Sequence, residues 1–175
     1  GNASCGDGPS LWHVARVPRL LKEMIRLVAR TSIILLSFFD GIGTAAWALS
    51  DLQCDVKLFV AWEWERAPHR VTMHHFPDVH QRGDLEHDDM DDISRVILEL
   101  DPFGRCLVIA CGGAPCTDYS NIRAAPPGRK GKTGRYFQIM LDQVDRLTRS
   151  LDKTHYVVKA FENVIPHHSL KEGVA

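Results

Sequence analysis

Apolar runs and segments with helical spacing alternate along most of the chain. Four apolar runs have the length and continuity of strands buried on both faces of a sheet, at 32–39, 55–63, 105–113 and 155–164. Segments typical of helices lie at 40–52, where a glycine turn comes first, and at 66–76, 93–100 and 135–151. Strands that alternate with helices in this way predict an α/β fold with a parallel sheet covered on both faces.

Two segments precede the first predicted strand. Residues 1–10 are rich in glycine and serine and are expected to form a disordered tail, and 11–30 have the apolar spacing of an amphipathic helix of about three turns. The remaining residues, 31–175, are expected to form one core, because a chain of 175 residues that is 45% hydrophobic and 25% charged suits a single globular domain.

The cysteines and the apolar runs indicate a reducing, intracellular setting. The chain has five cysteines, an odd number without CxxC spacing, and no charged leader followed by an apolar segment that would direct secretion. Its longest apolar run, IILLSFF, is far shorter than the roughly 20 residues that cross a bilayer. We therefore expect an intracellular protein without a membrane span.

Charge is nearly balanced overall but uneven along the chain. The formal net charge is -1, so contact with nucleic acid would need a local basic patch. One segment carries five basic residues and no acidic one between them: Arg123, Arg129, Lys130, Lys132 and Arg135. On charge alone a solvated flexible loop explains this segment better than a nucleic-acid contact does. The acidic segment HDDMDD is likewise expected to be a solvated turn, and no metal site is expected.

Polar groups follow the first two predicted strands, at the edge where parallel α/β sheets bind ligands. The first strand runs into FDGIG, whose glycines permit a tight turn and close approach of a ligand. The second ends in WEWE, where Glu63 could hold ribose hydroxyls and Trp64 could stack on a purine. Asp84 could accept a hydrogen bond from an exocyclic amine. Taken singly, these residues also suit packing, solvated and turn positions.

A thiol and a carboxyl group follow the third and fourth predicted strands. Cys116 comes directly after Pro115 in a polar loop, an unusual place for a packing cysteine. Glu162 and Asn163 come at the end of the fourth apolar run. A thiolate and a carboxyl group at neighbouring strand ends form a nucleophile and an acid. The glycine turn, the ribose carboxylate, the thiol and the acid in this order predict a group-transfer enzyme better than any one of them.

These segments together resemble the DNA cytosine-5 methyltransferase family over about residues 33–165. SFFDGIG resembles its cofactor motif, WEWE and GDL the two motifs that follow, GGAPCTDYS the Pro-Cys motif and FENV the Glu-Asn-Val motif. The amino-acid sequences of these segments are most similar to those of the animal de novo branch of the family. The resemblance implies a doubly wound, Rossmann-like methyltransferase core that uses S-adenosylmethionine, acts on DNA and, in a eukaryote, lies in the nucleus.

The resemblance also implies residue roles. The cofactor-binding set comprises Phe39, Asp40, Gly41, Ile42 and Gly43 around the methionine part, Glu63 on the ribose, Trp64 and Asp84 on adenine, and Pro115. Cys116 would be the nucleophile and Glu162 the acid that hydrogen-bonds the cytosine edge. Asn163 would fix the Pro-Cys loop, and Ser120 would support the site. The basic residues between Arg123 and Arg135 would contact DNA.

The implied chemistry explains these residue types. A thiolate that adds to carbon 6 of cytosine makes carbon 5 nucleophilic enough to take the methyl group, and a carboxyl group neutralises the charge that develops on the ring. A base inside a duplex must first be flipped out, which costs a few kcal/mol.

The chain departs from the family pattern after FENVIPHHSL, where no target-recognition region follows. The segment SLWHVARVPRLLKEM resembles the family's last motif, which suggests a permuted order or a unit cut from a longer chain; an unrelated amphipathic helix is the alternative. The core at 31–175 is thus expected to be incomplete and to need a C-terminal segment or a second chain. Two other functions stay open, a non-catalytic S-adenosylmethionine-binding or scaffolding fragment and a tRNA cytosine-5 methyltransferase.

Overall fold

A computed structural model describes residues 31–118, 127, 130–131, 133–151 and 153–163. The predicted tail at 1–10 and the predicted helix at 11–30 lie outside the described residues. The strands are β1 (Ser32–Phe38), β2 (Asp55–Trp62), β3 (His80–Gln81), β4 (Leu107–Gly113) and β5 (Tyr156–Glu162). The helices are α2 (Thr44–Asp51), α3 (Arg66–His75), the short 3₁₀ helix η1 (Leu85–His87), α4 (Met90–Leu100) and α5 (Gly134–Leu151).

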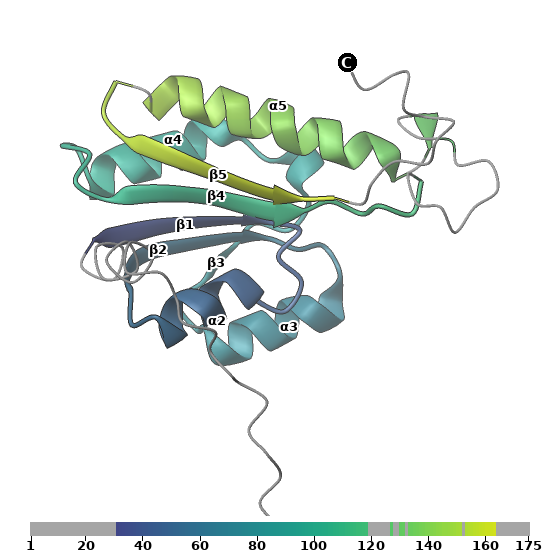
Figure 1. Cartoon of the computed structure of the whole chain (residues 1–175), viewed down its shortest axis with the longest axis horizontal. Helices are drawn as coiled ribbons and strands as arrows, with labels where there is room; N and C mark the ends of the chain where they lie inside the picture. The colour runs from purple at the N-terminus through teal and green to yellow at the C-terminus, as the bar shows by residue number, and fades with distance from the viewer. Residues whose placement is uncertain (1–30, 119–126, 128–129, 132, 152, 164–175) are drawn as a thin grey trace, which may run out of the picture.

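The described part of the chain forms an α/β, doubly wound fold, as predicted. All neighbouring strands pair in parallel, in the order β3-β2-β1-β4-β5. Helices α4 and α5 lie on one side of the sheet and α2 and α3 on the other (Figure 1). The strand order reverses between β1 and β4. Sheets of this kind bind ligands beyond the carboxyl ends of the strands at such a reversal, so we expect the site there.

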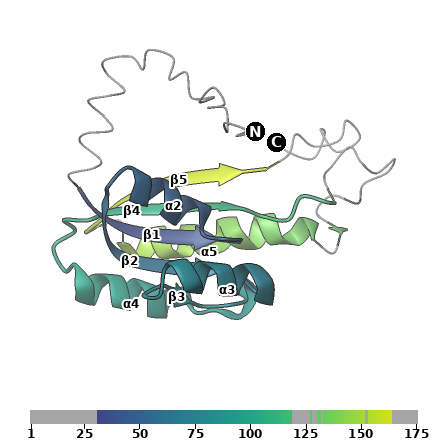
Figure 2. The ribbon, with the colours of Figure 1, turned by 90° about the horizontal axis from the view of Figure 1, so that it is seen from below.

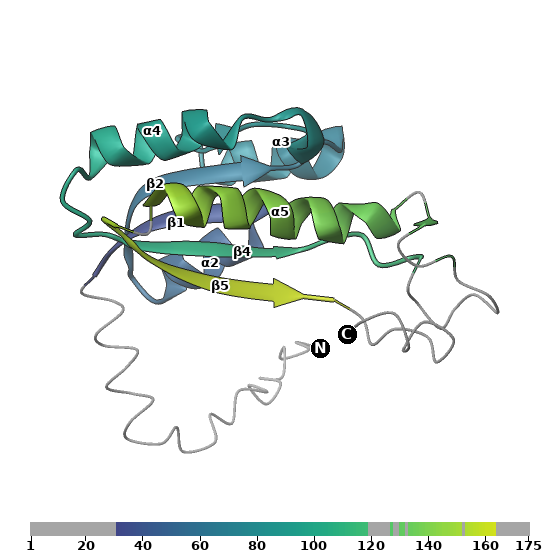
Figure 3. The same cartoon turned by 90° about the horizontal axis from the view of Figure 1, so that it is seen from above.

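The apolar runs form these strands because both faces of the central sheet are covered. Side chains of β1 alternate between two buried clusters, with Leu36 and Phe38 facing α4 and α5, and Ile33 and Leu35 facing α2 and α3. Views from the α2 and α3 side and from the α4 and α5 side show the two layers in turn (Figures 2 and 3). Full burial of one such side chain contributes about 1.5–3 kcal/mol, so a continuous apolar strand is favoured at the centre.

Two elements differ from the prediction. Strand β3 was not predicted, because its two residues are too short to show periodicity; they pair with Val60 and Ala61. Helix α4 begins at Met90, inside the segment expected to be a solvated acidic turn. Asp89 caps this helix by accepting from the Asp91 N–H, and acidic groups in the first turn suit the positive end of the helix dipole.

Strand β5 is an exposed edge of the sheet. Tyr156 is 75% exposed and Val158 is 37% exposed, although Val157 and Phe161 on the same strand pack against the core. An edge strand with exposed apolar side chains is able to accept a further strand or chain. No helix in the described part of the chain is long and apolar enough to cross a membrane.

Candidate cofactor and catalytic site

The turn between β1 and α2 has the backbone geometry of a ligand-binding turn. Phe39, Gly41 and Gly43 all have positive φ, at 53°, 62° and 83°. A side chain at Gly43 would approach the Phe76 ring at 3.2 Å and Thr72 at 3.3 Å, so glycine is needed there for both space and conformation. The residues between β1 and α2 therefore form a tight turn that ends at the N-terminus of α2, as predicted from FDGIG.

Two carboxylates hold this turn from inside. Glu63 is buried, and its two oxygens accept from the backbone N–H groups of Gly41 at 2.9 Å and Glu65 at 2.8 Å. Asp40 is also buried; it accepts from the Thr72 hydroxyl, and its own N–H donates to the Trp62 carbonyl. Burial raises the pKa of Asp40, although hydroxyl groups of Ser37 and Thr72 act in the opposite direction.

Three of the predicted cofactor residues meet in one aromatic cleft beside the sheet. The cleft is narrow, with a volume of about 10 Å³, room for about one water molecule, and is lined by Phe39, Trp62, Trp64, Gly83, Asp84, Leu85 and Tyr136. Trp64 is 59% exposed, and the Phe39 and Tyr136 rings meet edge to face with centroids 5.9 Å apart. Aromatic rings with one carboxylate among them are the residue types that hold a purine, and a purine that bound here would have to part these side chains.

The predicted groups differ in how freely they face this cleft. One oxygen of Asp84 accepts from the Glu86 N–H at 3.0 Å, and the other contacts His87 Nδ1 at 3.1 Å. A hydrogen bond from a ligand would therefore have to use the lone pairs that remain on these two oxygens. Glu63 is not among the cleft residues, and its role on ribose stays a prediction. Tyr136 and Leu85 were not predicted here, because their spacing indicated only the buried face of a helix and a turn.

The second group of predicted residues lies where β4 and β5 end. Gly113 pairs with Glu162 in the sheet, and a side chain at Gly113 would come within 3.0 Å of the Glu162 carboxylate. Cys116 is half-buried and follows Gly113 by three residues, so their Cα atoms are at most about 11 Å apart. Pro115 is half-buried beside Cys116, and Asn163 comes directly after Glu162.

An open cleft joins the cofactor turn to Glu162. It has about 1120 Å³ of space, open solvent included, and its lining contains Phe39, Asp40, Gly113 and Glu162. Groups predicted to bind cofactor and a group predicted to act on the base therefore share one surface. This convergence follows from the parallel strands, whose carboxyl ends lie at the same edge.

Asp118, which the sequence did not single out, anchors the loop that carries Cys116. It is buried, and one of its oxygens accepts from the Thr133 N–H at 2.6 Å, the Thr133 hydroxyl at 2.8 Å and the Gly134 N–H at 3.1 Å. The carboxylate thus caps the first turn of α5, where unpaired N–H groups and the helix dipole favour a negative charge. Asp118 lies only two residues from Cys116, so this contact positions the loop.

Replacing Asp118 with alanine is expected to slow the reaction that the motif resemblance predicts for Cys116 about 10- to 100-fold, because a displaced nucleophile would lose its alignment. Asp118→Asn, which keeps one acceptor oxygen, is expected to lose less. Single-turnover rates, taken well below the melting temperature, measure the effect. Asp142→Ala, which removes an exposed carboxylate from the same helix, is the control. A lowered melting temperature with an unchanged rate would show that Asp118 only stabilises the fold.

The three other cysteines in the described part of the chain have the properties of packing thiols. Burial raises the pKa of the Cys111 thiol to about 11, and burial also raises the pKa of Cys54 and Cys106. All three are therefore protonated, and poor nucleophiles, at neutral pH. Within the described ranges, no three His, Cys, Asp or Glu side chains come together as a metal site.

The basic segment is described only in part. Ser120, Arg123, Arg129 and Lys132 lie outside the described residues, and Lys130 is exposed. Arg135, predicted to contact DNA, donates from both guanidinium arms to Glu86, at 2.7 and 2.8 Å, and lies 5.3 Å from the centroid of the Tyr136 ring. Arg135 is thus paired with a protein carboxylate next to the aromatic cleft, and a phosphate would have to compete with Glu86.

Comparison with known proteins adds a structural likeness. No family model matches the chain. The structure is similar to a crystal structure of a mutant DNMT2 from Spodoptera frugiperda, at 18% sequence identity and a TM-score of 0.44. The similarity covers 82% of this chain and 38% of that one, so this chain spans well under half the length of that protein.

Proposed function

We propose that this chain is the cofactor-binding and catalytic part of a DNA cytosine-5 methyltransferase that uses S-adenosylmethionine. The observation that carries the proposal is the convergence at one sheet edge of the Phe39–Gly43 turn, the aromatic cleft, and Glu162 beside the Cys116 loop. The motif resemblance supports the same assignment and names the reaction.

The residues present fit S-adenosylmethionine. The cleft offers aromatic side chains and a carboxylate of the types that hold an adenine ring. Phe39, Trp64 and Asp84 would hold the nucleoside, while Asp40 lies buried at the end that would meet the amino acid part. When bound, the cofactor supplies an electrophilic methyl group on a sulfonium.

The chain's own residues would do the remaining work on a flipped cytosine. The Cys116 thiolate forms a bond to carbon 6, and the electron pair of the carbon 5–carbon 6 double bond moves toward carbon 5, which takes the methyl group. Glu162 donates a hydrogen bond to the ring edge and neutralises the developing charge. Loss of the carbon 5 proton to a base then returns an electron pair to the ring, and the thiolate leaves.

The Glu86–Arg135 pair yields a test of the DNA surface. Glu86→Gln is expected to tighten binding of a short duplex about two- to fivefold, because Arg135 is released to meet phosphate. Glu99→Gln removes the same charge from an exposed position on α4 and is the matched control. Fluorescence anisotropy at two salt concentrations measures both. If Glu86→Gln binds DNA no more tightly than Glu99→Gln, Arg135 does not contact phosphate.

A second candidate, an S-adenosylmethionine-binding or scaffolding fragment that needs a partner chain, is favoured by the exposed edge at β5. Calorimetry with S-adenosylhomocysteine and transfer of a labelled methyl group to duplex DNA or to tRNA separate the candidates. Labelled DNA supports the proposal. Cofactor binding without methyl transfer supports the non-catalytic fragment, and labelled tRNA would show that the substrate is tRNA and not DNA. Failure to bind the cofactor would reject the DNA methyltransferase, the tRNA methyltransferase and the fragment alike.

A further inference from the structure

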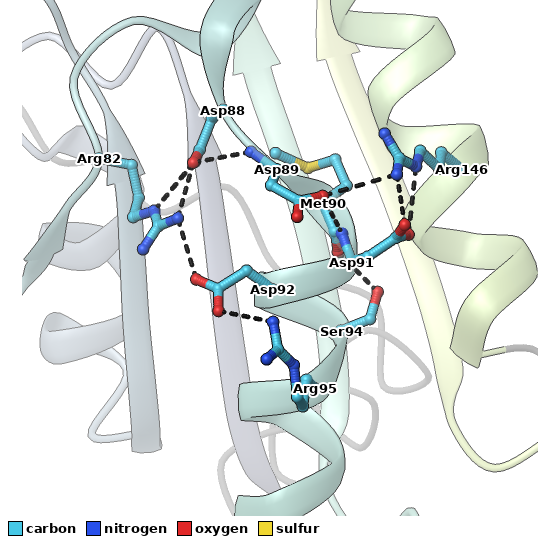
Figure 4. Close-up of polar contacts among 9 residues, drawn as sticks. All are labelled: Arg82, Asp88, Asp89, Met90, Asp91, Asp92, Ser94, Arg95 and Arg146. Atoms are coloured by element: carbon cyan, nitrogen blue, oxygen red, sulfur yellow. Dashed lines mark hydrogen bonds and ion pairs between the residues drawn. The ribbon is translucent and has the colours of Figure 1, made fainter.

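Asp88 joins three parts of the chain beside the aromatic cleft. Its carboxylate accepts from the Trp62 indole N–H at 2.6 Å and from Arg82, through Nε at 2.9 Å and through a guanidinium arm at 2.7 Å. It also accepts from the N–H of Asp89, the cap residue of α4 (Figure 4). One side chain therefore links strand β2, the segment after β3 and the start of α4.

The ion pair closes a short loop that forms one wall of the cleft. Arg82 directly precedes Gly83, and Asp88 follows three residues after Leu85, so the pair joins the two ends of the segment that carries Gly83, Asp84 and Leu85. Gly83 has φ of 78°, a left-handed turn that sends the chain back toward α4. The backbone at Arg82 is itself fixed, because its N–H donates to the Ala61 carbonyl.

The same carboxylate orients the ring at the base of the cleft. Trp62 is 1% exposed and stacks on Phe38 with ring centroids 4.5 Å apart. The stacking alone does not fix the rotation of the ring within its plane, but the hydrogen bond from Nε1 to Asp88 does. Trp62 and Asp84 both line the cleft, so Asp88 acts on two of its walls.

The neighbouring acidic residues are more exposed than Asp88. Asp92 also pairs with Arg82, at 3.1 Å, but its side chain is 37% exposed (Figure 4). The side chain of Asp88 is 10% exposed, whereas Asp91 is 59% exposed and pairs with Arg146 on α5 (Figure 4). Although burial alone would raise the pKa of Asp88, hydrogen bonds from Arg82 and Trp62 lower it, so the group is charged at neutral pH. A buried ion pair is costly to desolvate and is weak evidence for stability alone.

We propose that Arg82 and Asp88 are positioning residues that set the selectivity of the cleft for adenine. The inference rests on the proposed cofactor function. The pair fixes the two ends of the segment that carries the Asp84 carboxylate, which is the group predicted to accept from the exocyclic amine, and it fixes the Trp62 ring at the base of the cleft. A 6-oxopurine would place an acceptor oxygen where that amine donates, so the carboxylate would face a lone pair there; its hydrogen on this edge lies on N1 instead.

The test is the ratio of affinities for S-adenosylhomocysteine and S-inosylhomocysteine, measured by calorimetry on the full chain. The wild type is expected to prefer the adenosyl ligand by at least about tenfold. Asp88→Asn is expected to reduce this preference by at least about fivefold, and Asp91→Asn is expected to leave it unchanged. A loss of fold stability would lower both affinities equally and would not change the ratio.

An unchanged ratio in Asp88→Asn overturns the positioning role while leaving the cofactor function intact. Failure of the wild type to bind either ligand overturns both. If Asp88→Asn does not fold, Arg82→Lys is tested instead. Lysine keeps the charge but cannot donate two hydrogen bonds to one carboxylate as arginine does, so the same fall in the affinity ratio is expected. In the ligand-free protein, the indole N–H resonance of Trp62 is expected to be strongly shifted and slow to exchange, and to lose both properties in Asp88→Asn.

Discussion

Cys116→Ser is expected to reduce methyl transfer by on the order of 10⁴-fold or more, because a serine hydroxyl is far less nucleophilic than a thiolate toward carbon 6 of cytosine. Affinity for S-adenosylhomocysteine is expected to change less than about twofold, since the sulfur lies in the loop after β4 and not in the aromatic cleft. Single-turnover transfer of a labelled methyl group into duplex DNA measures the first effect, and calorimetry measures the second.

Cys54→Ser is the matched control for this substitution. Cys54 lies just before β2, its thiol pKa is raised by burial, and it is not among the residues that line either cleft near the strand ends. Its variant is expected to retain the wild-type rate. A serine variant at Cys116 that transferred methyl groups at the wild-type rate would contradict a covalent mechanism through this residue.

Glu162→Gln is expected to lower the rate of methyl transfer about 10²- to 10³-fold. Glutamine has nearly the same shape but cannot donate a carboxyl proton or carry its charge, so the ring loses the group that neutralises charge at its edge. The effect is expected in the rate at saturating DNA and not in the affinity for cofactor.

Glu99→Gln on α4 is the control, because Glu99 is exposed and far along the chain from the strand ends. The register supports the assignment: Glu162 lies opposite Gly113, where the absence of a side chain leaves room for the carboxylate. Gly113→Ala is therefore expected to disturb Glu162 and to lower the rate in the same direction. Equal rates for Glu162→Gln and the wild type would remove Glu162 from the catalytic step.

The central strands and the cofactor turn could be predicted from sequence because their causes are local. A continuous apolar run such as SIILLSFF indicates burial on both faces, and FDGIG indicates a tight turn through its glycines. Phe39, Trp64 and Asp84 were expected at one ligand, and the parallel sheet brings all three to one cleft.

Contacts between distant segments could not be predicted in this way. Asp118 caps α5 across 16 residues, and Trp62 reaches Asp88 across 26, so neither pairing leaves a periodic signal. Arg135 was assigned to DNA from the family resemblance and the charge of its segment, whereas the structure pairs it with Glu86, 49 residues away. The acidic segment was predicted only as a solvated turn, because Arg82 and Arg146, which pair with Asp88 and Asp91, lie on other elements.

Covalent trapping tests the central claim most directly. The protein is incubated with S-adenosylmethionine and a duplex that carries 5-fluorocytosine, whose fluorine prevents release of the enzyme, and the digested adduct is mapped by mass spectrometry. The proposed mechanism predicts DNA bound to the peptide that contains Cys116. An adduct on another residue, or no adduct from protein that methylates ordinary cytosine, would contradict it.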